Sequence, residues 1–112
     1  MKQITVLIVD DSALMRREIR RILESDPEFK VVAVSRNGQE ALQHIAEFDP
    51  DVVTLDINMP EMDGLTALQH IMMESPRPVV MLSSLTQEGA TTTYEALELG
   101  AVDFVGKPGG TI

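Results

Sequence analysis

The stretch that decides the fold is Val52-Val53-Thr54-Leu55-Asp56, followed by Ile57-Asn58-Met59-Pro60-Glu61-Met62-Asp63-Gly64. The first four residues suit a buried β-strand, and they run directly into a carboxylate. The residues after Asp56 include Asn, Pro, Asp and Gly, whose turn chemistry cannot continue the strand. Asp56 is therefore predicted to stand at the carboxyl edge of a sheet, where open α/β folds bind their ligands.

The composition fits one soluble globular domain and narrows its range of partners. The chain has 112 residues, of which 44% are hydrophobic, and a formal net charge of −9. This acidic balance argues against binding to a nucleic-acid backbone, and no apolar stretch is long enough to cross a bilayer. The absence of cysteine excludes disulfides, a thiolate nucleophile and a cysteine-based zinc site. We expect a cytoplasmic protein that binds neither nucleic acid nor membrane.

Apolar runs and turn residues alternate along the whole chain. They predict strands at 4–9, 29–34, 52–56, 79–83 and 102–106, with a helix after each of the first four. This alternation implies a parallel sheet with helices on both faces. The predicted fold class is α/β, a flavodoxin-like, doubly wound, five-stranded parallel sheet with the strand order 2-1-3-4-5. The first and third strands then lie side by side, which brings Asp10 and Asp11 next to Asp56.

Three helical segments carry specific expectations. Asp11 or Ser12 is expected to cap the first helix. The second helix is expected to carry Ala41, Leu42, Ile45 and Phe48 on one face. The stretch from Ser84 to Leu99 is predicted to be a helix with a weak start, because Gly89 and three consecutive threonines are poor helix formers.

The end of the chain leaves the predicted sheet incompletely covered. A helix would normally follow the fifth strand, but only Gly109-Gly110-Thr111-Ile112 remain. The first helix would then cover its face alone and leave apolar surface exposed. We interpret residues 1–112 as one domain of a longer protein, without its last helix and without its C-terminal effector domain. A further hypothesis is that two copies associate through the uncovered face.

Five polar residues are predicted to meet at the carboxyl edge of the sheet. Asp10, Asp11 and Asp56 would repel one another and need a cation, and hard oxygen ligands without His or Cys suit Mg²⁺. Asp56 could also attack phosphorus as a nucleophile, which would give an aspartyl phosphate. Ser83 and Lys107 end the fourth and fifth strands, so both would project over this edge. The lysine charge and the serine hydroxyl suit phosphoryl oxygens.

With these residues the chain resembles a response-regulator receiver domain over nearly all of its length. The resemblance is carried by Val9-Asp10-Asp11-Ser12, Leu55-Asp56-Ile57-Asn58-Met59-Pro60, Met62-Asp63-Gly64, Ser83 and Lys107-Pro108. It implies that Asp56 accepts a phosphoryl group from a phosphohistidine on a sensor histidine kinase. It also implies that this chain alone is a switch rather than an enzyme.

The resemblance further implies a role for each residue of the site. Asp11, Asp56 and the main-chain carbonyl of Asn58 would bind Mg²⁺, with Asp10 acting through water. Lys107 would contact the phosphoryl group. Two switch residues would respond to it: the Ser83 hydroxyl would move onto the phosphoryl group, and the Phe104 ring would rotate inward behind it.

A narrower resemblance is to the receiver of chemotaxis protein-glutamate methylesterases. It rests on Asp10 to Arg16, on Met81-Leu82-Ser83-Ser84-Leu85-Thr86 and on Gly100 to Pro108. In those proteins the receiver blocks a C-terminal serine-hydrolase domain until phosphorylation relieves the block, and a chemotaxis kinase is the expected partner. The chain has no G-x-S-x-G nucleophile elbow, so a methylesterase/glutamine deamidase activity would belong to a longer parent protein.

Other readings remain open at this point. The output could be a different one, or the receiver could stand alone. A phosphatase of the haloacid dehalogenase type would need a second aspartate two residues after the nucleophile, where this chain has Asn58. A flavodoxin-like cofactor binder would need a hydroxyl- or glycine-rich phosphate loop after the first strand, where this chain has Asp10-Asp11 instead. His44 and His70 are expected to be exposed helix residues rather than a metal pair.

Overall fold

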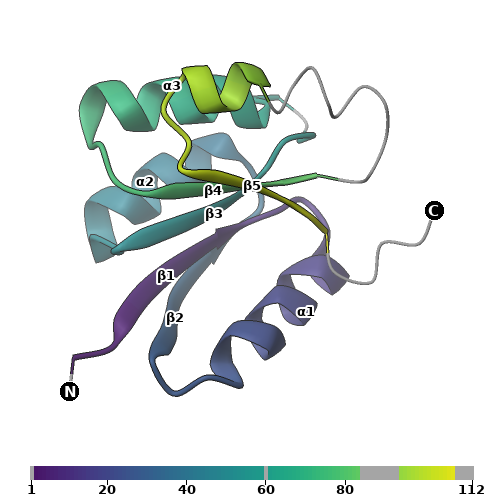
Figure 1. Cartoon of the computed structure of the whole chain (residues 1–112), viewed down its shortest axis with the longest axis vertical. Helices are drawn as coiled ribbons and strands as arrows, with labels where there is room; N and C mark the ends of the chain where they lie inside the picture. Colours follow the sequence, from purple (N-terminus) through teal and green to yellow (C-terminus); the bar gives the residue numbers. More distant parts are fainter. Residues whose placement is uncertain (1, 60, 84–93, 108–112) are drawn as a thin grey trace.

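The computed structural model describes residues 2–59, 61–83 and 94–107. Figure 1 shows one twisted parallel sheet with helices packed on both of its faces. The elements are β1 (Ile4–Val9), α1 (Ala13–Glu24), β2 (Phe29–Ser35), α2 (Gly38–Phe48), β3 (Val52–Asp56), α3 (Gly64–Glu74), β4 (Val79–Ser83) and β5 (Asp103–Gly106). Residues 94–98 are also helical. The observed strand order, β2-β1-β3-β4-β5, confirms the predicted fold class.

All four strand pairs are parallel, so every strand ends at the same edge of the sheet. The chain reverses its winding at β1, which pairs with β2 on one side and with β3 on the other. Val9 lies opposite Leu55, and Asp56 lies opposite Leu82. The residues that follow β1 and those that end β3 and β4 are therefore collected at one place, as the sequence predicts.

The helices after β1, β2 and β3 begin with side-chain caps. Ser12 Oγ accepts from the Met15 amide at 3.2 Å, Asn37 Oδ1 from the Glu40 amide at 2.8 Å, and Asp63 Oδ1 from the Thr66 amide at 2.9 Å. Of the two caps expected for α1, Ser12 is the one used. These caps satisfy amides that have no partner within their own helix and fix where each helix begins.

One face of the sheet is closed by α2, α3 and residues 94–98. Its core combines the β-strand residues Leu7, Val53, Leu55 and Met81 with residues of the covering helices, among them Ala41, Ile45, Leu68, Ile71 and Ala96. Phe48, which was expected on the same face of α2 as Ala41 and Ile45, is 43% exposed. Phe48 is the last residue of the helix, and its ring packs edge-on against the ring of His44.

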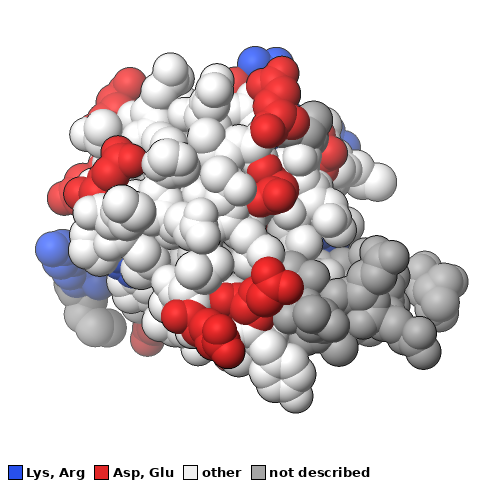
Figure 2. Space-filling view, turned by 90° about the horizontal axis from the view of Figure 1, so that it is seen from above, with Lys and Arg blue, Asp and Glu red and all other residues white. Residues whose placement is uncertain are grey.

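Charge is distributed unevenly over the surface. The side formed by α3 and residues 94–98, at the top of Figure 1, carries the exposed acids Glu74, Glu95 and Glu98. Figure 2 shows this side, with acidic side chains across it and basic ones only near its margins. The arginines of α1 lie on the opposite side of the sheet (Figure 1). A phosphate backbone would be repelled by the acidic side.

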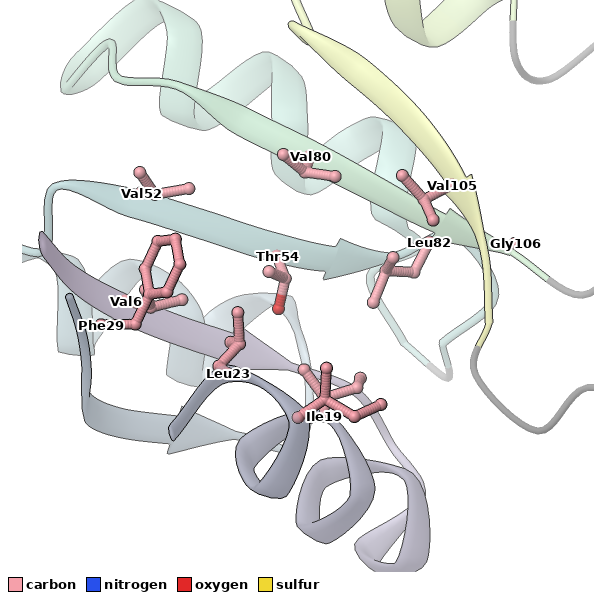
Figure 3. Close-up of a pocket in the computed structure, with 11 residues that line it drawn as sticks. Val6, Ile19, Leu23, Phe29, Val52, Thr54, Val80, Leu82, Val105 and Gly106 are labelled. Atoms are coloured by element: carbon pink, nitrogen blue, oxygen red, sulfur yellow. The ribbon is translucent and has the colours of Figure 1, made fainter. Parts of the chain in front are cut away.

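The other face of the sheet is only partly covered. Among the described residues α1 is the one helix on this face, and its Ile19 packs with Val6, Ile8, Val31 and Leu82. Beside α1 lies an apolar groove of about 360 Å³ over β1, β3, β4 and β5 (Figure 3). The groove is lined by Val6, Ile19, Ile22, Leu23, Phe29, Val52, Thr54, Val80, Leu82, Val105 and Gly106. Within the described part of the chain, apolar surface on this face is thus left open.

Some expectations fall at the margins of the described chain. β5 begins at Asp103 rather than at Val102, which is 60% exposed. Of the helix expected from Ser84 to Leu99, only residues 94–98 are described as helical, and residues 84–93 lie outside the described part, as does Pro108. No helix in the described ranges is long and apolar enough to cross a membrane.

Candidate metal centre at the carboxyl edge of the sheet

Three carboxylates meet where β1 and β3 end. Asp10 directly follows β1, Asp11 comes next, and Asp56 is the last residue of β3. Oxygen atoms of the three side chains lie within 4.8 Å of one another. Asp10 and Asp56 are fully buried, whereas Asp11 is exposed. The sequence-predicted trio is therefore one cluster, with its exposed member facing solvent.

The hydrogen bonds in this cluster leave two buried carboxylate oxygens without a donor. Asp10 Oδ1 accepts from the Ser12 amide at 2.9 Å, and Asp56 Oδ1 accepts from the Asn58 amide at 3.2 Å. Asp10 Oδ2 and Asp56 Oδ2 have no hydrogen-bond partner in the described part of the chain. A buried charged oxygen that accepts no hydrogen bond is costly, and a cation is the group that satisfies it best.

Lys107 bridges the two buried carboxylates. Its Nζ lies 3.1 Å from Asp56 Oδ1 and 3.3 Å from Asp10 Oδ2, so it forms an ion pair with both carboxylates. Burial by itself would lower the pKa of Lys107, but the hydrogen bond to Asp56 and the charges of Asp56 and Asp10 outweigh it, so the pKa lies above its usual value. Lys107 is therefore charged at neutral pH and supplies a single positive charge to the site.

The pKa of Asp56 is raised from 3.8 to about 6. Burial of the carboxylate is the largest cause, and the charge of Asp10 is the next. Lys107 and the Asn58 amide act in the opposite direction without cancelling these effects. One lysine does not balance two buried carboxylates, so the cluster retains negative charge that a divalent cation would neutralise.

The remaining predicted site residues lie on the neighbouring strands. Ser83 ends β4 and is almost fully buried, and its main-chain carbonyl accepts from the Lys107 amide at 2.8 Å. Ser83 pairs with Gly106, which precedes Lys107. Phe104, half-buried in β5, packs against the core of the closed face. The sheet thus brings Asp10, Asp11, Asp56, Ser83 and Lys107 to one edge.

Comparison with known proteins gives this edge its context. A family model described as the response regulator receiver domain matches residues 6–111. The chain belongs to this receiver family. Protein-glutamate methylesterase/protein-glutamine glutaminase 2 of Carboxydothermus hydrogenoformans is 65% identical over 112 residues, which are 100% of this chain and 32% of that protein. The receiver thus spans about a third of the length of that curated relative.

Solved structures agree with this assignment. The response regulator domain of Thermotoga maritima CheB superposes with a TM-score of 0.90 at 50% identity, covering 99% of this chain and 83% of that one. A structure of the P1 domain of CheA3 with CheY6 from R. sphaeroides gives a TM-score of 0.83 at 42% identity, covering 100% and 88%. The chain is thus a receiver similar to those of chemotaxis methylesterases, which confirms the narrower resemblance.

The residues present at the receiver's edge fit a hard divalent cation. The donors are carboxylate oxygens, two of which are buried without a hydrogen-bond donor, and neither histidine belongs to the cluster. Oxygen donors at this density suit Mg²⁺ rather than a softer metal. Asn58 is exposed and follows Asp56 by two residues, so its main-chain carbonyl is available as a further oxygen ligand.

Two residues that support the site were not singled out from the sequence. Gly64 brings the start of α3 against the site, because a Cβ at this position would lie 2.3 Å from the main-chain oxygen of Asp56. Arg16, in the first turns of α1, donates from Nη1 to the main-chain oxygen of Asp10 at 2.8 Å. Gly64 ends the Met62-Asp63-Gly64 motif, which was a usable signal. An arginine six residues after an aspartate carries no comparable pattern.

Proposed function

We propose that Asp56 is the phosphoacceptor of this receiver and takes a phosphoryl group from a phosphohistidine on a sensor histidine kinase. The observation that carries the proposal is the state of Asp56: it is buried, one of its oxygens lacks a hydrogen-bond partner, and its pKa is raised to about 6. A carboxylate in this state is poorly solvated, which favours its use as a nucleophile.

The reaction follows from the positions of the groups. A carboxylate oxygen of Asp56 attacks phosphorus, the bond between phosphorus and the imidazole nitrogen of the donor breaks, and the electron pair stays on the imidazole. The products are an aspartyl phosphate and a histidine on the kinase. Catalysis here is positioning and charge neutralisation, since the protein supplies no further covalent chemistry.

The acidic cluster would hold Mg²⁺ next to the phosphoryl group. Asp11, Asp56 and the main-chain carbonyl of Asn58 are the proposed ligands, and Asp10 would act through water. When bound, Mg²⁺ neutralises charge on the phosphoryl oxygens. Lys107, already paired with Asp56, would also donate a charge-assisted hydrogen bond to a phosphoryl oxygen.

Ser83 and Phe104 are the proposed switch residues. Ser83 ends the strand next to β3, one residue beyond the level of Asp56, so its hydroxyl would reach a phosphoryl group on that carboxylate. Phe104 is half-buried, which leaves it room to turn further inward when Ser83 moves. We propose that this pair carries the state of Asp56 to the β4 and β5 side of the molecule.

In a longer protein this receiver would control a protein-glutamate methylesterase/glutamine deamidase in the cytoplasm. The proposal rests on the curated relative, whose printed name is that activity and of which the receiver covers 32%. A chemotaxis kinase is the proposed phosphodonor, because the similar CheY6 is described in complex with the P1 domain of CheA3. The chain itself is proposed to be a switch and not an enzyme.

We further propose that the isolated chain forms homo-oligomers through the apolar groove. Ile22 and Val105, at 44% and 45% exposure, both line this groove and would be covered by a second copy. Light scattering over a wide concentration range would show a mass that rises with concentration. A monomer throughout that range would contradict the proposal.

Acetyl phosphate tests the phosphoacceptor assignment directly. With Mg²⁺, we expect intact-mass spectrometry to detect one added phosphoryl group on the wild type and none on Asp56→Asn. The matched control is Asp51→Asn, which removes a carboxylate five positions earlier at the other end of β3 and should be phosphorylated like the wild type. Equal labelling of Asp56→Asn and the wild type would reject Asp56 as the acceptor.

A further inference from the structure

The main chain of Asp10 is held from two sides by residues outside the acidic cluster. Its amide donates to the main-chain oxygen of Ser35 at 3.0 Å, which continues the pairing of β1 with β2 by one residue. Its carbonyl accepts from Arg16 Nη1 at 2.8 Å. Asp10 is fully buried, so each of these main-chain groups needs a partner within the protein.

Arg16 closes the turn between β1 and α1. The turn contains two more hydrogen bonds, from the Ser12 amide to Asp10 Oδ1 and from the Met15 amide to Ser12 Oγ. The main-chain amide of Arg16 donates to the Ser12 carbonyl at 3.0 Å, while its side chain reaches back to Asp10. The same residue therefore ties the first turn of the helix to both ends of the short connection.

Asp11 lies inside this closed turn. No hydrogen bond or ion pair within the described ranges holds the Asp11 carboxylate itself, and its side chain is exposed. Its position relative to Asp56 is thus set by the main chain on either side of it. If the turn loosened, Asp11 would move away from the other two carboxylates more readily than Asp10, which is buried.

We propose that Arg16 is a positioning residue of the cation site, which holds the Asp10–Ser12 turn so that the Asp10 and Asp11 carboxylates converge with Asp56. This inference rests on the proposed function, since Arg16 would position the ligands of the cation that phosphorylation needs. Residues that orient ligands without touching the metal act in the same way in other metal sites.

The other arginines of α1 provide the contrast. Arg20 pairs with Glu24 and Arg21 with Glu18, and both pairs lie on the exposed side of the helix. Arg17 is exposed and makes no hydrogen bond or ion pair within the described residues. Among the arginines of α1, Arg16 is the half-buried one, and it donates a hydrogen bond to the main chain of Asp10 in the site. Arg17 is therefore a matched control of equal charge.

Charge and position predict opposite effects, which makes the test decisive. Removing a positive charge near an acidic site reduces the repulsion that a bound cation experiences, so cation binding becomes stronger. Removing a positioning residue weakens it, because the carboxylates no longer converge. We expect isothermal titration of Mg²⁺ to give a Kd about tenfold higher for Arg16→Met than for the wild type. The Kd of Arg17→Met for Mg²⁺ should stay within about twofold of the wild-type value, because screening weakens exposed charges. Any change should be toward tighter binding.

A conservative variant separates position from fold. Arg16→Lys keeps the charge and a donor at the end of a flexible side chain, so its Kd for Mg²⁺ should lie between those of the wild type and Arg16→Met. All titrations are made well below the Tm of each variant. An Arg16→Met protein that is folded and binds Mg²⁺ as tightly as the wild type, or more tightly, would overturn the proposal.

The wild type offers a readout that needs no variant. Mg²⁺ should shift the guanidinium NMR signals of Arg16 and the amide signal of Ser12, and leave the guanidinium of Arg17 unchanged. Unchanged Arg16 signals at saturating Mg²⁺ would overturn the proposal even if the Arg16 variants failed to fold. Acetyl phosphate labelling of the wild type is run in parallel. Its failure would reject the proposed function, whereas the Mg²⁺ titrations judge Arg16 separately.

Discussion

Asp51 directly precedes β3 and Asp56 ends it, and the fold shifts the pKa values of the two carboxylates in opposite directions. At the amino edge, Asp51 Oδ2 accepts from the amide of Thr5 at 2.9 Å and from its hydroxyl at 3.0 Å. The hydrogen bond from the Thr5 amide is the largest cause that lowers the pKa of Asp51, and the hydrogen bond from the Thr5 hydroxyl is the next. At the carboxyl edge, burial and the Asp10 charge raise the pKa of Asp56 to about 6.

The difference separates a carboxylate that stabilises the fold from the proposed phosphoacceptor. Asp51 is exposed, and the hydrogen-bond donors around it stabilise its negative charge. Asp56 is buried, faces another carboxylate, and keeps one oxygen without a donor. Nearby at the amino edge, Arg77 Nη1 also donates to the Pro50 carbonyl at 2.6 Å. Polar groups are thus satisfied at one edge and left unsatisfied at the other, as expected where a sheet reserves one edge for a ligand.

The largest effect should come from adding a methyl group at the carboxyl edge of the sheet. Gly64→Ala would place a Cβ 2.3 Å from the main-chain oxygen of Asp56, and neither backbone can yield easily. We expect urea denaturation to show a loss of about 3 kcal/mol in the free energy of unfolding, as for severe overpacking. Slower phosphorylation should accompany this loss, because the end of β3 must shift.

Gly38→Ala is the matched control for this prediction. Its Cβ would meet the flexible Met62 side chain, with Sδ at 2.7 Å, and alanine favours the helix that begins there. We expect a change within about 1 kcal/mol. An equal loss in both variants would show that the close contact at Asp56 has no special weight.

The sequence predicted the part of the site that depends on strand ends. Each apolar run stops at a polar residue, and parallel pairing then brings Asp10, Asp56, Ser83 and Lys107 to one edge whatever their side-chain conformations. The strand order decided the rest, since only adjacent β1 and β3 put Asp10 beside Asp56. This part of the prediction rests on periodicity and turn chemistry, which are properties of short segments.

Features that depend on the path of a single side chain were not predictable. The bond from Arg16 to the Asp10 carbonyl requires one rotamer of a long side chain, and nothing in the pattern of α1 distinguishes Arg16 from Arg17. His44 was expected to be exposed, but it is half-buried and 2.7 Å from the Ser35 hydroxyl. Phe48 was expected on the apolar face of its helix, and it is 43% exposed. Local sequence does not specify such contacts.

The next effect is a gain in stability at the cost of function. Asp56→Asn removes a buried charge whose pKa is raised to about 6, and it relieves the repulsion with Asp10. In Mg²⁺-free buffer at pH 7.5, we expect the free energy of unfolding to rise by about 2 kcal/mol, from about two pKa units at 1.36 kcal/mol each less some loss of the Lys107 pair. A variant less stable than the wild type would mean that Lys107 fully compensates Asp56.

The gain in stability of Asp56→Asn should depend on pH between the unfolded pKa of 3.8 and the folded pKa of about 6. The folded protein holds a proton on Asp56 up to about pH 6, whereas the unfolded chain loses it near the ordinary aspartate pKa of 3.8. The wild type therefore loses stability from this group as pH rises between those values, and the loss is complete above them. The difference between Asp56→Asn and the wild type should be near zero at pH 4 and full at pH 7. A constant difference from pH 4.5 to 7 would contradict the raised pKa.

The smallest effect is expected at the amino edge and has the opposite sign. Asp51→Asn retains an oxygen that can accept both bonds from Thr5, but it lacks the charge that strengthens them. We expect a slightly lower Tm at pH 7. Because the pKa of Asp51 is lowered, its contribution is present above the unfolded pKa and is lost only as pH falls through the folded one.

The two aspartates thus differ in where their pH dependence falls as well as in sign. From pH 5 to 7 the loss in Asp51→Asn should stay constant, while the gain in Asp56→Asn grows up to about pH 6 and then levels off. Thermal melts of both variants and of the double variant over this range test the comparison. Because the two residues lie at opposite ends of β3 and share no hydrogen-bond partner, their effects should add. A pH-dependent loss in Asp51→Asn above pH 5 would instead mean that donors alone do not decide how the fold uses a carboxylate.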